Sequence, residues 1–142
     1  MKPDIIKQFV DTGKVQFVYK HLAFLGPESL WAAQAAECAA DQGKFWEYHD
    51  IVFARQQGEN QGAFSKDKLI GFAQELGLDM AQFEPCLKED RTLERVQGDI
   101  NEAEGLGVRS TPTFFINGRP VAGALPIENF HAIIEQAQAE LQ

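Results

Sequence analysis

The feature that most constrains the fold of this chain is a long block of helical periodicity, residues 28–106, with a shorter β-type segment on either side. Within the block, apolar residues recur three or four positions apart, which is the spacing of one buried helix face. Gly43 and Gly77 close two apolar runs, while Ser65 and Asp79 stand at N-cap positions. The block therefore predicts several separate amphipathic helices.

The segment before this block, Lys14 to Leu22, has the two-residue period of a β-strand. Three apolar or aromatic side chains alternate with their neighbours there, namely Val15, Phe17 and Tyr19 with Gln16, Val18 and Lys20. Upstream of it, residues 2–12 have apolar positions at helical spacing, and Gly13 follows as a left-handed C-cap. We expect a short helix and then a strand ahead of the helical block.

The segment after the block predicts a β-hairpin followed by a helix. Asn117-Gly118 is the strongest short-range hairpin signal, and it separates the β-runs Thr113–Ile116 and Arg119–Ala122. Pro126 then opens a last helix whose apolar residues keep helical spacing. The predicted order is helix, strand, helical block, hairpin and helix, which belongs to the α/β class.

Composition places the chain among ordinary soluble globular domains and argues against two other classes of protein. The chain has 142 residues, of which 44% are hydrophobic and 24% charged, enough for one domain with its own core. A net charge of −8 without a basic stripe argues against nucleic-acid binding. No apolar run reaches the roughly 20 residues that span a bilayer, and the first residues do not form a signal peptide. We expect neither a nucleic-acid partner nor membrane insertion.

The two cysteines, Cys38 and Cys86, leave two interpretations open. They form no Cys-x-x-Cys pair and no Cys/His cluster with zinc spacing, so no metal site is expected. Both lie on predicted apolar helix faces, where free cysteine behaves as a small buried hydrophobe. A structural disulfide between them is the alternative.

The histidines and carboxylates offer no clear acid–base pair. His49 lies in an aromatic-rich helical run, where we expect it to pack or to hydrogen-bond rather than to catalyse. His21, near the end of the predicted strand, is a candidate for a site residue, and His131 is the remaining histidine. Glu102 and Glu104 belong to a solvated helix face rather than to a carboxylate pair.

Three stretches of the sequence occur in an order and spacing that match a known family. They are residues 35–40 with 43–50, residues 83–87, and the most specific one, Gly107–Gly118, which reads Gly-Val-Arg-Ser-Thr-Pro-Thr-Phe-Phe-Ile-Asn-Gly. Together they resemble the DsbA-like thioredoxin family of thiol–disulfide oxidoreductases, from about Asp11 to the C-terminus. The resemblance implies an α/β thioredoxin-like fold of the DsbA type, with residues 1–142 in one domain and a helical insertion at about residues 27–106.

The resemblance also implies where a site lies and what it lacks. In the family, a Cys-x-x-Cys dithiol follows the first core strand and opens the first long helix. The chain is thus expected to start partway along that helix, N-terminally truncated, with the strand and the dithiol upstream of Met1 and with no catalytic residue of its own. The family further implies a cis bond between Thr111 and Pro112. Ser110, Thr111 and Pro112 would form a substrate-binding loop that pairs with a peptide as an added strand.

The expected activity of the parent protein is the oxidation of substrate thiols to disulfides or the isomerisation of substrate disulfides. Its partners would be substrate polypeptides with thiols or disulfides, and it would need no cofactor. By resemblance the parent is extracytoplasmic, either periplasmic or secreted. In such an oxidising compartment Cys38 and Cys86 would form a structural disulfide. For this chain alone we expect little or no redox activity.

Two further expectations concern the sheet and the alternatives. Without its central strand, the sheet would present unpaired edges on the 14–22 strand and on the hairpin, so we expect self-association or strand exchange across the open sheet. Two other functions stay open. One is a glutathione-binding transferase or isomerase on the same fold, and the other is a noncatalytic peptide-binding module.

Overall fold

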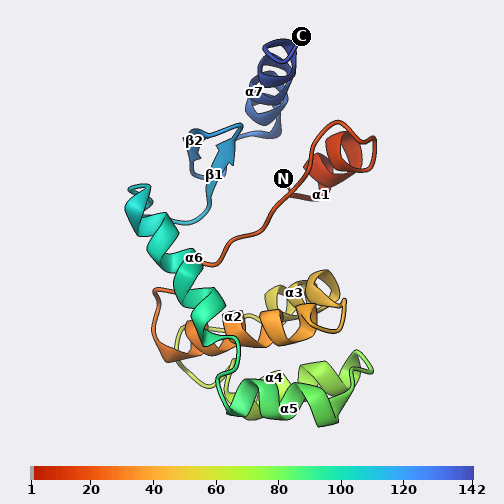
Figure 1. Cartoon of the computed structure of the whole chain (residues 1–142), viewed down its shortest axis with the longest axis vertical. Coiled ribbons are helices and arrows are strands. Elements are labelled where there is room, and N and C mark those ends of the chain that lie inside the picture. The colour runs from red at the N-terminus through yellow and green to blue at the C-terminus, as the bar shows by residue number, and fades with distance from the viewer. Residues whose placement is uncertain (1) are drawn as a thin grey trace. The chain divides into compact units, whose positions relative to one another are not determined.

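The structure is a computed structural model that describes residues 2–142. The described residues are mainly helical and contain a single two-stranded sheet. They divide into two compact units (Figure 1). The hairpin unit joins the segment up to Lys20 to Leu106–Gln142, and the helical unit is His21–Gly105.

Five helices make up the helical unit, as the periodicity predicts. They are α2 (Pro27–Ala40), α3 (Phe45–Ala54), α4 (Lys66–Glu75), α5 (Met80–Lys88) and α6 (Leu93–Gly105). Both predicted caps are confirmed. The Ser65 side chain accepts a hydrogen bond from the Lys68 N–H at 3.4 Å, and the Asp79 side chain accepts one from the Gln82 N–H at 3.3 Å. Each cap satisfies an N–H group that the first turn of a helix leaves without a partner.

The helical unit has its own core, built from the apolar faces of α2 to α5. Its largest fully buried side chains include Tyr48, Leu69, Phe83 and Leu87. The Tyr48 hydroxyl donates to the main-chain carbonyl of Leu69 at 2.8 Å, and burial raises the pKa of Tyr48. This hydrogen bond offsets the cost of removing the hydroxyl from water.

A disulfide in this core joins Cys38 of α2 to Cys86 of α5, with 6.0 Å between their Cα atoms. Both cysteines are buried. Beside them, and just before α6 begins, the buried Thr92 hydroxyl donates to the main-chain carbonyl of Gln34 at 2.9 Å. Of the two interpretations left open by the residues alone, the structure contains the disulfide that the family resemblance implies.

The hairpin unit combines the two ends of the chain. Its first helix begins as α1 (Lys2–Ile5), continues as a π-helical segment, η1 (Ile6–Val10), and is followed by Gly13 with φ of +75°. The C-terminal helix α7 (Ile127–Ala139) packs against α1. The shared core is formed by Ile5, Phe9, Phe130 and Ile134.

The predicted strand from Lys14 to Leu22 is wrong. These residues have no regular secondary structure, and Figure 1 draws them as a coil. The alternation that suggested a strand persists in the burial pattern, because Val15, Phe17 and Tyr19 are half-buried while Gln16 and Val18 are exposed. A strand also requires a hydrogen-bonded neighbour, which β-propensity does not supply. Among the described residues, the sheet contains only the two hairpin strands.

The hairpin forms where Asn117-Gly118 predicts it. β1 (Thr113–Ile116) pairs antiparallel with β2 (Arg119–Ala122). The angle φ is +49° at Asn117 and +82° at Gly118, which are the left-handed values that this two-residue turn requires. The turn type thereby fixes the register of the two strands.

The two faces of the hairpin have different environments. Phe114, Ile116 and Val121 pack against the core of the hairpin unit, and the Phe114 ring lies edge-on to Phe130 with 4.9 Å between centroids. Side chains alternate along a strand, so the residues between them lie on the opposite face. One face of the hairpin therefore stabilises the unit, and the other is available for a site.

Candidate functional site

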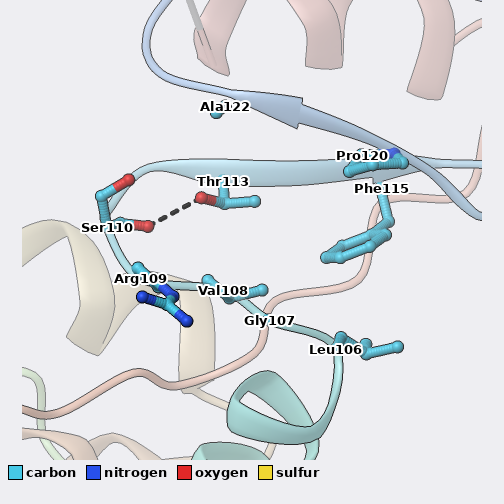
Figure 2. Close-up of a pocket in the computed structure, with 9 residues that line it drawn as sticks. All are labelled: Leu106, Gly107, Val108, Arg109, Ser110, Thr113, Phe115, Pro120 and Ala122. Atoms are coloured by element: carbon cyan, nitrogen blue, oxygen red, sulfur yellow. Dashed lines mark hydrogen bonds between the residues drawn. The ribbon is translucent and has the colours of Figure 1, made fainter.

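An open pocket of about 230 Å³ lies over the second face of the hairpin (Figure 2). Four of its lining residues form two register pairs across the strands, Thr113 with Ala122 and Phe115 with Pro120. The remaining lining residues belong to the linker that follows α6, namely Leu106, Gly107, Val108, Arg109 and Ser110. The pocket is thus built entirely within the hairpin unit.

The linker follows the end of α6 through a turn at Gly107. This residue has φ of +76°, a left-handed value that glycine adopts without steric cost. The turn is followed by the rest of the linker, which leads to the start of β1. Of the described residues that line the pocket, Arg109 is the only charged one, and it is exposed.

Two hydrogen bonds fix the end of the linker to the hairpin. The Thr113 hydroxyl donates to the main-chain carbonyl of Ser110 at 2.7 Å, as Figure 2 shows. The Gly123 N–H donates to the carbonyl of Pro112 at 2.8 Å. The peptide bond between Thr111 and Pro112 is cis, which is the isomer implied by the resemblance. Ser110 lines the pocket, whereas Thr111 and Pro112 are exposed beside it and are not part of its lining.

The edge of β1 away from β2 adjoins the same linker. Within residues 2–142, β2 is the only strand that pairs with β1. An edge strand presents N–H and C=O groups that can pair with another chain. The pocket and this edge thus offer two kinds of contact to an extended peptide, one for side chains and one for the main chain.

The three histidines do not line this pocket. His21 is buried in the helical unit, where its Nε2 lies 2.9 Å from the Glu37 carboxylate. That hydrogen bond is the largest cause that lowers the pKa of Glu37, and the nearby Arg95 lowers it further. His49 stacks on Phe53 with 4.5 Å between ring centroids.

The other candidates considered from the sequence also lie outside the lining of the pocket. His131 of α7 lies edge-on to Phe9, with 5.0 Å between ring centroids. Glu102 and Glu104 are exposed on α6. The buried Cys38–Cys86 bond belongs to the helical unit and is not part of the pocket.

Several pocket residues were not singled out as site residues from the sequence. Val108, Phe115, Pro120 and Ala122 lie outside the expected Ser110–Pro112 loop. The period of the hairpin strands could have indicated three of them. Once Phe114 and Val121 are placed in the core, Phe115, Pro120 and Ala122 must lie on the other face.

Comparison with known proteins places this arrangement in a family. A family model described as thioredoxin matches residues 1–136. The chain belongs to the thioredoxin family. Among curated relatives of this thioredoxin-family chain, "Na(+)/H(+) antiporter NhaA 1" of Salinispora arenicola is 36% identical over 140 residues, covering 97% of the chain and 21% of the relative. The chain spans about one fifth of the length of the antiporters that it matches.

A second relative bears a name related to disulfide chemistry. "Probable disulfide bond formation protein D" of Bacillus anthracis is 28% identical over 120 residues, which cover 82% of the chain and 55% of that protein. None of the helices described over residues 2–142 has the length and apolar character needed to cross a membrane.

Solved structures confirm the expected fold, which is thioredoxin-like and of the DsbA type. Oxidised BdbD from Bacillus subtilis matches with a TM-score of 0.88 at 23% identity, over 96% of this chain and 76% of that one. The thiol–disulfide exchange protein α-DsbA2 from Wolbachia pipientis matches with a TM-score of 0.77 at 23% identity, over 94% and 71%.

Proposed function

We propose that this chain is the polypeptide-binding part of a DsbA-type thiol–disulfide oxidoreductase, which oxidises thiols to disulfides or isomerises disulfides in substrate proteins. The observation that carries the proposal is the coincidence of the pocket with the free edge of β1 in the hairpin unit. Membership of the thioredoxin family and the DsbA-type fold support the type of chemistry.

In the proposed binding mode, an extended substrate segment adds a strand along the free edge of β1. Main-chain hydrogen bonds would provide affinity, and alternate side chains of the substrate would enter the pocket. Ser110, Thr111 and Pro112 would hold the start of that segment. All three are exposed. The hydrogen bonds that Thr113 and Gly123 donate to the carbonyls of Ser110 and Pro112 hold this end of the linker in place.

The exchange reaction needs a group that these residues do not supply. In an oxidation, two substrate thiols lose two electrons and two protons, and an enzyme disulfide gains them to become a dithiol. The attacking group at each step is a thiolate that is accessible to the other sulfur. Cys38 and Cys86 are joined to each other and buried. We therefore propose that the 142 residues alone bind substrate without exchanging disulfides.

The proposed setting of the parent protein is extracytoplasmic, in the periplasm or secreted. The Cys38–Cys86 disulfide supports it, because structural disulfides persist in oxidising compartments and are rare in the cytosol. Alkylation of thiols in freshly lysed cells tests this setting. A fully reduced pair in the native protein would contradict it.

The binding proposal is tested by titrating the isotope-labelled chain with an amidated peptide, Gly-Thr-Val-Ser-Val-Gln-Thr-Gly, and following its amide NMR signals. The peptide has serine at the position where a substrate would have its reactive cysteine, so that no disulfide exchange occurs. We expect signals of residues 106–116 to shift and those of α2 to α5 to stay. An unchanged spectrum, or shifts confined to the helical unit, would contradict the proposal. Signals that move with reduced glutathione but not with the peptide would favour the glutathione-binding alternative.

A further inference from the structure

Arg109 differs from every other arginine of the chain in its partners. The sequence has five arginines. Four of them pair with a carboxylate: Arg55 with Glu75, Arg91 with Glu89, Arg95 with Asp41, and Arg119 with Glu140, at 2.6–2.9 Å. Among the described residues Arg109 has no ion pair, although acidic residues outnumber basic ones by 21 to 13. Within residues 2–142, it is also the only charged residue that lines the pocket.

The pocket is polar at one end and apolar at the other. Figure 2 shows Arg109 next to Ser110 and Thr113 on one side, and Phe115 with Pro120 on the other. The Thr113 hydroxyl is engaged as a donor to the Ser110 carbonyl. Within residues 2–142 the Ser110 hydroxyl has no hydrogen-bond partner, so the polar end offers this hydroxyl and the guanidinium as donors.

We infer that this site selects substrate segments in which an acidic side chain accompanies an apolar one. The carboxylate would bind the guanidinium of Arg109, whose planar fork matches a carboxylate in two parallel hydrogen bonds. The apolar side chain would lie against Phe115 and Pro120. The inference rests on the proposed function, since it names the substrate class of the same pocket.

Because the chain has a net negative charge, its overall charge does not explain a preference for acidic peptides, and the preference depends on Arg109. At a net charge of −8, the molecule as a whole repels acidic peptides. Attraction of a carboxylate therefore has to come from a cation at the site, and Arg109 is that cation. Removal of Arg91, which lies in the helical unit, changes the overall charge equally and takes no residue from the lining of the pocket.

The test uses two peptides with amidated C-termini, Gly-Thr-Val-Ser-Val-Glu-Thr-Gly and its Gln analogue, each labelled at the N-terminus with the same fluorescein group. The glutamate is then the only carboxylate that differs between the two peptides. Dissociation constants are measured by fluorescence anisotropy for the native chain, for Arg109→Gln and for the matched control Arg91→Gln. We expect the native chain to bind the Glu peptide about three- to tenfold more tightly than the Gln peptide, as for a partly exposed charged pair. The ratio should fall to about one in Arg109→Gln, stay unchanged in Arg91→Gln, and shrink in the native chain at high salt.

Each other outcome has a distinct meaning. Equal binding of both peptides to the native chain would overturn the inference and leave the proposed function standing. A preference that survives in Arg109→Gln would overturn the assignment to Arg109. Failure of the native chain to bind either peptide would overturn the proposed function, and the inference with it.

Discussion

Cys38 and Cys86 hold the helical unit together through a bond that closes a loop with a sequence separation of 48 residues. In the chain-entropy account, a cross-link over such a loop stabilises the folded state by restricting the unfolded one, and disulfides typically contribute about 2–4 kcal/mol. We therefore predict that Cys38→Ala/Cys86→Ala lowers the free energy of unfolding by about that amount. Urea denaturation monitored by circular dichroism checks it, with the reduced native chain as a control. Equal stability of oxidised and reduced native chain would contradict the prediction.

Glu37 gives the helical unit a dependence on pH. Its pKa is lowered in the folded state, first by the hydrogen bond from His21 and then by Arg95. A lowered folded-state pKa means that the carboxylate stabilises the fold above its unfolded-state pKa, and that this contribution is lost as the pH falls. We predict that between about pH 6 and pH 3 the native chain loses more stability than Glu37→Gln does. Urea titrations of the native chain and of Glu37→Gln at several pH values measure the two free energies of unfolding. If these depend on pH in the same way, the prediction is wrong.

At the scale of single elements, the hairpin turn makes a sharp test. Gly118 has φ of +82°, so a Cβ there is strained even though nothing lies within 4 Å of it. We predict that Gly118→Ala destabilises the chain by about 1 kcal/mol. The matched control is Gly98→Ala inside α6, where the same methyl group also meets nothing within 4 Å and φ is not left-handed. That change should stabilise the chain by up to about 1 kcal/mol. Thermal unfolding of both variants tests the two predictions. A loss of stability in both would contradict the attribution of the Gly118→Ala effect to its left-handed φ.

The helices and the hairpin could be predicted from the sequence because their signals are local. Ser65 and Asp79 cap helices through hydrogen bonds to residues three positions on, and Asn117-Gly118 sets the turn within two residues. The segment 14–22 shows the opposite case. Its alternating residues predict burial on one side, which the structure retains, but a strand depends on a partner distant in sequence. Local pattern does not reveal whether that partner exists.

The same distinction applies to the candidate site. The motif around Ser110, Thr111 and Pro112 could be found by resemblance, whereas the pocket depends on the register of β1 against β2. Arg109 belongs to the matched stretch Gly107–Gly118, but the sequence alone assigns it no role. Its significance comes from the absence of an ion pair among the described residues, and this cannot be read from the sequence. The assignment of residues 1–142 to a single domain stays a prediction.

For the whole molecule, the free edge of β1 predicts association between copies. An exposed edge strand tends to pair with another strand, and a second copy carries the same edge. We predict concentration-dependent self-association by strand pairing or exchange, measured as a rise in mass by light scattering at low micromolar concentration. Because the binding peptide would occupy the same edge, an excess of it should shift the mass toward the monomer. A constant monomer mass over the concentration range would contradict this prediction.

The isolated chain should also lack turnover. Without an accessible thiolate it cannot form the mixed disulfide through which exchange proceeds. We predict that insulin reduction and the refolding of a reduced, denatured substrate proceed at the rate of the uncatalysed control. Turnover that is lost in Cys38→Ser would show that the buried pair takes part in the reaction.

The opposite environments of the two hairpin faces also limit how this region can change over evolution. Substitutions at Thr113, Phe115, Pro120 or Ala122 alter the pocket and leave the core packing of Phe114 and Val121 in place. An insertion or deletion of one residue in either strand has another effect, because it turns every later side chain to the other face. Recognition can therefore diversify by point substitution alone, and relatives with different preferences should keep strands of equal length.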